Sequence, residues 1–277
     1  MPKRETTGTQ SLDRAFAVLR LIAARAGRGI KLADLVRQSG LTRPTIHRLV
    51  EALGRQGFVA KDSATRLYHL GPEAFVLGTL ASERYGIHQA ALPSLARLAE
   101  ASEDTAFLTI RLDRHGVCLH RQEGAFPIRS YVLQPGNRHP LGVGAGCLAI
   151  LAALPPGEAD EMIAANTPDL LARYPGFPPT TIQRMVALTR ETGYALNPGL
   201  LHAGSWGVGV AVINRQGHCV GALSIAAIES RMDAARCDRL AASLHFEANK
   251  LTEALDRPTG ASTLAARARR NGRSGAA

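Results

Sequence analysis

Apolar residues near the N-terminus recur at helical spacing, and they predict two short helices joined by a glycine-containing turn. The stretch from residue 33 to 59 reads ADLVRQSGLTRPTIHRLVEALGRQGFV. Gly40 stands where the first helix should end in the left-handed conformation that glycine adopts cheaply. A second helix is predicted over residues 43–55, because four apolar residues then fall at i, i+3, i+4 and i+7: Ile46, Leu49, Val50 and Leu53.

The opposite face of this second helix is polar and basic, with His47, Arg48, Glu51 and Arg55. Thr42 suits the N-cap and Pro44 the first turn. A capped helix with a basic outer face is what entry into the major groove of DNA requires. A solvated face on an ordinary helix pair is the simpler alternative, but cap, turn and period agree, which favours DNA binding. The residues predicted to contact DNA on this helix are Arg43, Pro44, Thr45, His47 and Arg48.

The segments around this helix pair predict a winged helix-turn-helix. An earlier helix should begin at Ser11, with an inward stripe of Leu12, Phe16, Leu19 and Ala23. Residues 58–59 begin a strand, residues 61–66 are turn-like and residues 67–70 alternate like a returning strand. Lys61 and Arg66 lie near the tip of this wing, within reach of phosphates. Solvated hairpin charges explain either residue equally well when it is taken singly.

Beyond Gly71-Pro72 the pattern changes from helices to mixed elements. A connecting helix is expected over 73–84, and another over 89–101, for which Pro93 could mark the true start. A hairpin signal, Asp113-Arg114-His115-Gly116, separates two apolar strands. We expect strands at 105–112, 117–123, 129–133, from 193 onward, at 206–213 and at 218–226, and helices at 147–154, 158–166, 179–192 and 232–255. This order predicts an α+β domain with an antiparallel sheet, since it offers few βαβ units.

The charge is unevenly distributed along the 277 residues. The net charge is +10, of which residues 1–70 hold +8, residues 71–256 hold −3 and residues 257–277 hold +5. A basic head on a slightly acidic body suits a protein that binds a polyanion. The last segment is small, basic and glycine-rich, and we expect it to be disordered.

The composition argues against several classes of protein. The four cysteines, Cys118, Cys147, Cys219 and Cys237, stand far apart without a CxxC or Cys/His cluster, so neither a zinc site nor a disulfide scaffold is expected. Cys147 and Cys219 are interpreted as small buried hydrophobes rather than redox sensors. No apolar run reaches the length of a membrane span and no secretory signal is evident, so we expect a cytoplasmic protein without metal or cofactor.

Six segments together carry a resemblance to a known family. They are SLDRAFAVL, LADLVRQSGLTRPTIHRLVEALGRQGFV, LYHLGPEAF, PLGVGAGCLAILAALP, ETGYAL and VINRQGHCVGALSI. In their order and spacing, over about residues 10–256, the chain resembles the IclR (isocitrate lyase regulator) family of bacterial transcription factors. The resemblance implies a ligand-responsive regulator that binds double-stranded operator DNA as a homodimer or homotetramer. It also implies a GAF/PAS-like second domain that binds small organic acids.

On this basis we expect four segments. Residues 1–71 form the winged helix-turn-helix, residues 72–88 the linker helix, residues 89–256 the GAF-like effector-binding domain and residues 257–277 a basic tail.

The resemblance also implies an effector pocket. The family's positions fall on Ala145 and Gly146 in the glycine-rich loop, Asn197 after the Gly-Tyr-Ala turn, Gly207 on the next strand, Ser224 and Ala226 at a strand end, and Tyr131 in an apolar wall. This chain departs from the family pattern at Cys147-Leu148, at Asn197, where relatives often carry an acid, and at Ala226. Trp206 stands beside the pocket strand and is expected to contact the ligand.

The residues support an anion site independently of the resemblance. A glycine-rich loop at a helix start exposes backbone N–H groups, and the helix dipole adds partial positive charge. The alternative is that Gly142, Gly144 and Gly146 only make a tight turn from strand to helix. Two other functions stay open: an enzyme with a basic docking domain, and a DNA-binding protein without an effector. The chain shows no nucleophile elbow, no P-loop and no paired metal ligands, which favours a regulator over an enzyme.

Overall fold

The computed structural model describes residues 9–25, 27–82, 86–128 and 133–256. Within these residues the chain forms two compact units. The main division falls between residues 82 and 86, and the short segments 117–119 and 133–138 are grouped with the first unit. Three expectations fall wholly or mostly outside the described residues: the strand at 129–133, the wall residue Tyr131 and the tail at 257–277.

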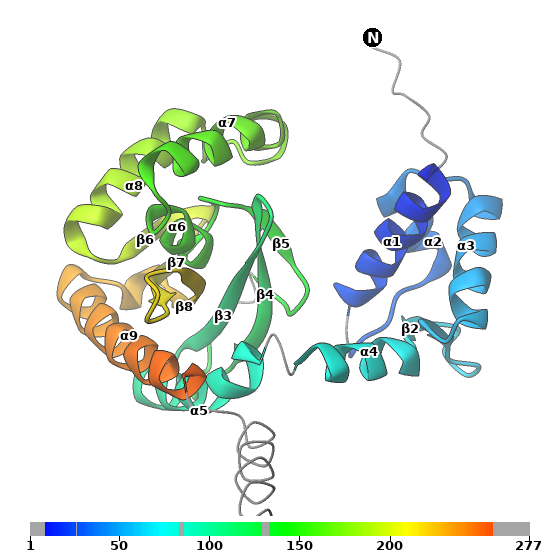
Figure 1. The fold of residues 1–277 in the computed structure, drawn as a ribbon, viewed down its shortest axis with the longest axis horizontal. Helices are drawn as coiled ribbons and strands as arrows, with labels where there is room; N and C mark the ends of the chain where they lie inside the picture. Colours follow the sequence, from blue (N-terminus) through cyan, green and yellow to red (C-terminus); the bar gives the residue numbers. More distant parts are fainter. Residues whose placement is uncertain (1–8, 26, 83–85, 129–132, 257–277) are drawn as a thin grey trace, which may run out of the picture. The chain divides into compact units, whose positions relative to one another are not determined.

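Three helices and a two-stranded wing build the N-terminal unit (Figure 1). The helices are α1 (Gln10–Ala23), α2 (Leu32–Ser39) and α3 (Arg43–Arg55), and the antiparallel wing strands are β1 (Val59–Lys61) and β2 (Tyr68–Leu70). Gly40 ends α2 at a φ of 67°, and Thr42 precedes α3 as its N-cap, both as predicted. The predicted stripe of α3 is confirmed, since Ile46, Leu49 and Val50 are buried and Leu53 packs against the same core.

The predicted inward face of α1 is wrong for Leu12 and Phe16, whereas Leu19 packs against the core as expected. Leu12 and Phe16 are 60% and 53% exposed, whereas Val18 and Ile22 are buried in the core with α2 and α3. The helix is apolar on two sides, so its sequence fits more than one stripe, and packing selects the stripe that includes Val18 and Ile22. It also begins at Gln10 rather than after a cap at Ser11.

Helix α4 (Pro72–Ser82) follows the wing without a flexible joint. The Gly71 N–H donates to the Phe58 carbonyl at 2.8 Å, and the Glu73 N–H donates to the Gly57 carbonyl at 3.1 Å. A Cβ on Gly71 would lie 2.1 Å from the Gly57 oxygen, so only glycine allows this approach. None of the residues of α4 is buried, although the helix carries Phe75, Val76, Leu77 and Leu80.

A six-stranded sheet in the order β5-β4-β3-β8-β7-β6 is the centre of the C-terminal unit (Figure 1). The strands are β3 (Thr105–Leu112), β4 (His115–Gln122), β5 (Arg138–Pro140), β6 (Ala195–His202), β7 (Ser205–Ile213) and β8 (Cys219–Ile228). The pairs β3–β8, β7–β8 and β6–β7 are antiparallel. The α+β architecture expected from the sequence is therefore present.

Helices cover both faces of this sheet. Helices α5 (Ile87–Ser102) and α9 (Ala234–Leu255) pack together on one face, where α9 contacts β7 and α5 contacts β3 (Figure 1). On the other face α6 (Ala145–Ala152) contacts four strands and also α7 (Pro156–Arg173) and α8 (Pro179–Thr192). A single turn of 3-10 helix, η1 (Glu229–Arg231), joins β8 to α9.

Several boundaries differ from those predicted. Pro93 lies inside α5 instead of at its start, because buried Ala91, Leu95 and Leu98 hold the helix together around the exposed proline. Helix α6 begins two residues earlier than expected and ends two earlier. Helix α7 runs to Arg173 through Pro168, far beyond the predicted 158–166, and the three-residue β5 was not predicted. The bounds of α8 and β3 are confirmed.

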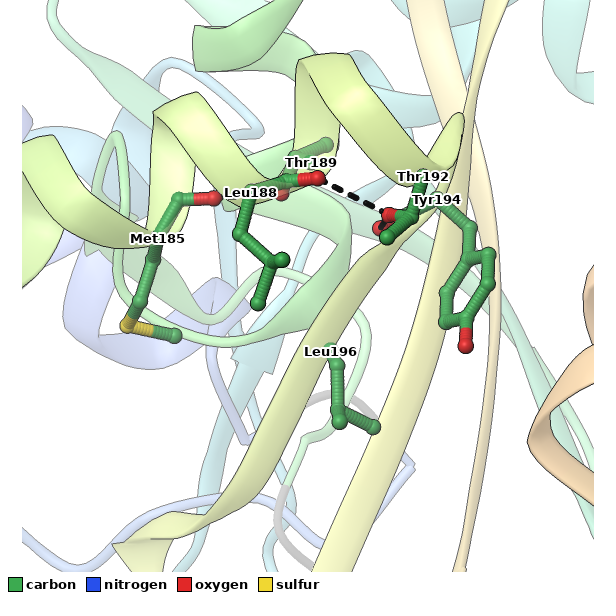
Figure 2. A pocket seen from close by; sticks show the side chains of 6 residues that line it. All are labelled: Met185, Leu188, Thr189, Thr192, Tyr194 and Leu196. Atoms are coloured by element: carbon green, nitrogen blue, oxygen red, sulfur yellow. Dashed lines mark hydrogen bonds between the residues drawn. The ribbon is translucent and has the colours of Figure 1, made fainter. Parts of the chain in front are cut away.

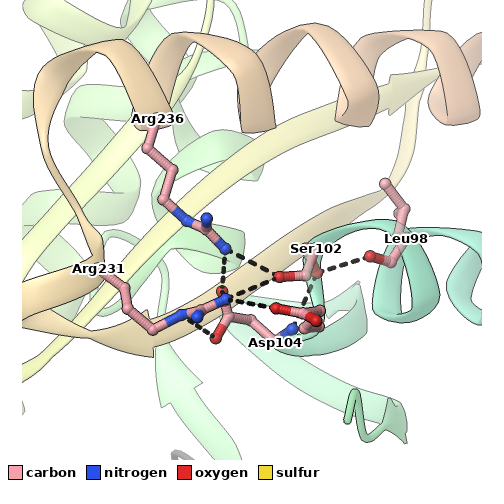
Figure 3. Close-up of polar contacts among 6 residues, drawn as sticks. Leu98, Ser102, Asp104, Arg231 and Arg236 are labelled. Carbon is pink, nitrogen blue, oxygen red and sulfur yellow. Dashed lines mark hydrogen bonds and ion pairs between the residues drawn. The ribbon is translucent and has the colours of Figure 1, made fainter. Parts of the chain in front are cut away.

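A buried carboxylate ties the end of α5 and the start of β3 to α9 (Figure 3). Asp104 is 4% exposed and pairs with Arg236 at 2.7 Å and with Arg231 at 3.2 Å. Both guanidinium groups also donate to the Ser102 carbonyl, at 2.8 and 3.1 Å. Two arginines and one carboxylate thereby hold the strand that begins at Thr105 in place.

His139, on β5, lies in surroundings that favour its neutral form in the folded protein. Its Nδ1 lies 3.2 Å from the Tyr174 hydroxyl. Burial, and to a smaller extent the nearby His202, Arg173 and His115, lower the pKa of the His139 imidazole from 6.5 to about 4. The unfolded chain therefore binds a proton at a higher pH than the folded protein does.

This difference predicts a loss of stability as the pH falls from about 6.5 to about 4. At pH 5 the folded protein should lose up to about 2 kcal/mol through His139 alone. His139→Asn should remove this part of the loss, because asparagine takes up no proton in this range. Chemical denaturation of the wild type and of His139→Asn at pH 7 and pH 5 measures the loss of stability. An equal loss in the two proteins would contradict the assignment of this loss to His139.

Candidate DNA-binding helix and effector site

The outer face of α3 is open to solvent, as DNA contact requires. Arg43, Pro44, His47 and Arg48 are exposed, and Thr45 is half-buried. The Thr45 hydroxyl lies 2.9 Å from that of Thr42 at the start of the helix. Among the described residues no carboxylate pairs with Arg43 or Arg48, whereas His47 lies 3.4 Å from Glu51. Two guanidinium groups are thus free for an anionic partner near the N-terminal end of α3.

The wing adds two more cations on a fixed turn. Asp62 accepts the N–H groups of Ala64 at 2.8 Å and Thr65 at 3.1 Å, and these bonds hold the pKa of the Asp62 carboxyl below its usual value. Lys61 and Arg66 are both exposed on this hairpin. Lys61 Nζ lies 5.6 Å from the centre of the Tyr68 ring.

In the C-terminal unit, the first turn of α6 lies directly on the backbone of β7. A Cβ on Gly209 would be 2.7 Å from the Ala145 oxygen, and one on Gly207 would be 3.3 Å from the Ala145 Cβ. On the helix side, a Cβ on Gly146 would be 2.8 Å from Thr109 Oγ1 and 3.4 Å from Ser224 Oγ. Helix and sheet can approach this closely only because these positions lack side chains.

Gly144 forms the N-cap of α6 at a φ of 80°, which explains one of the glycines as a turn residue. Ala145 and Gly146 are therefore not loop residues but the first two residues of the helix. The interpretation of the glycine stretch as a tight turn applies to Gly144. Gly146 serves the close contact with Thr109 and Ser224 instead.

Four residues from four strands form a cross-strand row under the N-terminus of α6. Asn197 on β6 lies opposite Gly207 on β7, Gly207 opposite Ala226 on β8, and Ala226 opposite Thr105 on β3. Residues directly opposite one another in antiparallel strands share a face of the sheet. Since Gly207 faces Ala145, the whole row lies on the α6 face.

The ends of the cross-strand row are polar and its middle is small. Thr105 is 2% exposed and Asn197 is 6% exposed, with glycine and alanine between them. The Asn197 Oδ1 atom is buried and has no hydrogen-bond partner among the described residues. The next pairs along β8 and β3 place Ser224 and Thr109 further under α6.

The structure brings together Ala145, Gly146, Asn197, Gly207, Ser224 and Ala226 on one face, but not Trp206. Trp206 immediately precedes Gly207, so strand alternation directs it to the opposite face of the sheet, and its contact with a ligand stays a prediction. Thr105 and Thr109 were missed. The alternation Thr-Ala-Phe-Leu-Thr in β3 puts both threonines on one face, and that signal was available in the sequence.

A separate hollow of about 50 Å³ lies between α8 and the outer side of β6 (Figure 2). It is lined by Met185, Leu188, Thr189, Thr192, Tyr194 and Leu196. Leu196 neighbours Asn197 on the strand and so points away from the cross-strand row. The Thr189 hydroxyl donates to the Met185 carbonyl at 2.7 Å, which leaves mainly apolar surface in the hollow.

A metal site, a reactive thiol and a membrane span have little support in the structure. In the described part of the chain no three His, Cys, Asp or Glu side chains gather as a metal site. Burial raises the pKa of the Cys219 and Cys237 thiols, which makes thiolate formation harder. No helix among the described residues is both long and apolar enough to span a membrane.

Comparison with known protein families assigns both units. Residues 11–63 match the IclR helix-turn-helix domain, and residues 79–253 match the C-terminal domain of the bacterial transcriptional regulator IclR. The chain belongs to the IclR family. Its resemblance to that family is thereby confirmed.

Relatives of this IclR protein are named as regulators of transcription. It is 28% identical to XynR of Escherichia coli over 255 residues, which cover 90% of this chain and 98% of XynR. It is 27% identical to BhcR of Paracoccus denitrificans over 251 residues, covering 90% and 88%. This protein is accordingly a transcriptional regulator with a DNA-binding and an effector domain, and not an enzyme.

Solved structures agree with this assignment. An IclR regulator from a Silicibacter species superposes with a TM-score of 0.69 at 28% identity, covering 88% of this chain and 95% of that one. A regulator from Alicyclobacillus acidocaldarius superposes with a TM-score of 0.70 at 25% identity, covering 88% and 98%.

The contact between α6 and β7 generates a prediction about stability. Gly209→Ala would press a methyl group against the Ala145 carbonyl, which is backbone and cannot rotate away. We expect a loss of about 1–3 kcal/mol, measured by chemical denaturation. Gly157→Ala is the control, because its Cβ would meet nothing within 4 Å. Equal stability of the two variants would show that α6 tolerates displacement from β7.

Proposed function

We propose that this IclR regulator binds a small carboxylate over the cross-strand row and that binding changes the affinity of α3 for operator DNA. The observation that carries the proposal is the placement of the row under the N-terminus of α6. The helix N-terminus attracts an anion through its dipole and its free N–H groups. Glycine and alanine in the middle of the row let the first turn of α6 come down to the strands, close to the polar ends of the row at Asn197 and Thr105.

The electrostatics of the row suit a negative ligand. Thr105, Ala226, Gly207 and Asn197 carry no charge, so a carboxylate meets no repulsion from them. Asn197 matters most here, because an acid at this position would raise the cost of binding an anion. Ser224, close to Gly146, is placed to donate a hydroxyl hydrogen bond.

A structural relative lends support from outside the chain. An IclR homologue from Microbacterium hydrocarbonoxydans, with a TM-score of 0.69 and 21% identity, was solved in complex with 4-hydroxybenzoate. That ligand is a small carboxylate, and the two effector domains share their fold.

We assign DNA contact to the solvent-exposed face of α3 and to the wing. The residues are Arg43, Pro44, Thr45, His47 and Arg48 on or beside the first two turns of α3, with Lys61 and Arg66 on the wing. Residues 1–71 then form the DNA-binding domain, 72–88 the linker, 89–256 the effector domain and 257–277 a basic tail that adds phosphate contacts. A regulator of this kind acts where operator DNA lies, in the bacterial cytoplasm.

We further propose that the regulator works as a homodimer or homotetramer on a two-fold operator. One short recognition helix contacts only a few base pairs, so two heads are needed for useful specificity. The exposed apolar side chains of α4, together with Leu12 and Phe16 of α1, offer surface that a second copy would cover.

The DNA-binding assignment predicts a loss of sequence discrimination in Arg48→Ala. If Arg48 reads a guanine edge, the variant should lose about 1–3 kcal/mol of operator binding and relax its preference at one base pair. Arg184→Ala, which removes an exposed arginine from α8, is the matched control and should bind like the wild type. Selection from a randomised operator library measures both. An unchanged base preference in a folded Arg48→Ala protein would remove Arg48 from this role.

The effector assignment predicts weaker carboxylate binding in Ser224→Ala. Removing one hydrogen bond to a charged group should cost about 1.5–3 kcal/mol, a loss of roughly tenfold or more in affinity. Ser224 is preferable to Gly146 as a test, since any side chain at Gly146 would collide with Thr109 and displace α6. Calorimetry with benzoate and its hydroxylated derivatives gives the affinities, with the exposed Ser243→Ala as control. Equal affinity in wild type and Ser224→Ala would place the anion elsewhere.

A further inference from the structure

The buried side chain of Asn197 contains a polar atom that makes no hydrogen bond within the described part of the fold. It lies on the edge strand β6 and is 94% buried at the end of the cross-strand row. Its Oδ1 atom has no hydrogen-bond partner among the described residues. A buried amide oxygen without a donor destabilises the folded state, and an apolar residue of the same size would avoid that cost.

A second buried asparagine shows the contrast. Asn166 on α7 is 1% exposed, and its Nδ2 donates to the Arg114 carbonyl at 2.8 Å. Asn166 therefore links α7 to the turn between β3 and β4, which is a structural role. Asn197 carries an unused acceptor at the same depth of burial, directed into the row that faces α6.

We infer that the effector carries a hydroxyl group in addition to its carboxylate, and that this hydroxyl donates to Asn197 Oδ1. The inference rests on the proposed function, because the anion at α6 defines where the ligand lies. A hydroxyl is the donor that this site favours. An ammonium group would be removed from water opposite a neutral amide, with no countercharge in Thr105, Ala226, Gly207 or Asn197 to offset the loss.

The register of the strands sets the spacing of the two ligand groups. Ala145, the first residue of α6, lies over Gly207. Asn197 is the residue opposite Gly207 on the neighbouring strand β6. Adjacent strands lie about 4.8 Å apart, so carboxylate and hydroxyl should be separated by roughly 5–7 Å. This distance fits ring-hydroxylated aromatic acids and ω-hydroxy aliphatic acids, and it is too long for 2-hydroxy acids.

The first test needs no ligand and compares Asn197→Leu with Asn166→Leu by thermal melting of the full chain. Leucine matches asparagine in shape but cannot accept or donate. Asn197→Leu should melt at or above the wild-type temperature, since it removes an unpaired acceptor, whereas Asn166→Leu should melt several degrees lower. A fall in melting temperature of Asn197→Leu equal to that of Asn166→Leu would make Asn197 a structural residue and overturn the inference.

The second test uses matched acids: 3- and 4-hydroxybenzoate against benzoate, and 4-hydroxybutyrate against butyrate. Calorimetry should show the wild type binding at least one hydroxy acid about tenfold more tightly than its partner without the hydroxyl. Asn197→Leu should lose that difference, so that it binds the hydroxy acid no more tightly than the acid without the hydroxyl.

The outcomes separate this inference from the proposed function. If parent and hydroxy acids bind the wild type equally, or if Asn197→Leu keeps the discrimination, the hydroxyl assignment is overturned and the carboxylate site stands. If none of the acids binds, the carboxylate effector fails and the hydroxy acid fails with it.

Discussion

The direct contact between the backbones of α6 and β7 determines the architecture of the effector domain. Side chains normally separate the backbone of a helix from that of a sheet, but Gly209 and Gly207 have none, and Gly146 removes the obstacle on the helix side. The N-terminus of α6 is thereby brought down to the level of the strands.

The opposite ends of the cross-strand row are held by different means. At one end, Thr105 follows Asp104, which two arginines bind from α9 and η1, so the start of β3 is rigidly placed (Figure 3). Removing either arginine would leave a buried carboxylate underpaired, which is a costly change. At the other end, Asn197 lies on an edge strand whose pairing with β7 becomes irregular between Pro198 and His202. The cross-strand row thus runs from a strand start held by ion pairs to an edge strand with irregular pairing.

Much of the fold could be predicted from the sequence, because its signals are local. The bounds of α3 and α8 follow from caps and period, and the change to alternating strands marks the second domain. The sequence could not predict which face of a helix is buried when the helix has more than one apolar face. Helix α1 has two apolar stripes, and only the packed core shows that Val18 and Ile22 face inward. The four members of the cross-strand row lie up to 121 positions apart in the chain, and only strand register brings them together. Family resemblance supplied three of them. Alternation along β3 indicates which face Thr105 shares with Thr109, but its position opposite Ala226 follows only from the strand register.

The attachment of α4 to the wing gives the DNA-binding unit a mechanical property. Because Gly71 and Glu73 are bonded to Phe58 and Gly57, the helix and the wing turn as one body. The 11 residues of α4 make a lever about 16 Å long. A rotation of about 10° around the wing end sweeps the far end of that lever through roughly 3 Å. A displacement of about 3 Å at the far end of α4 therefore corresponds to a rotation of about 10° of the wing to which the helix is bonded.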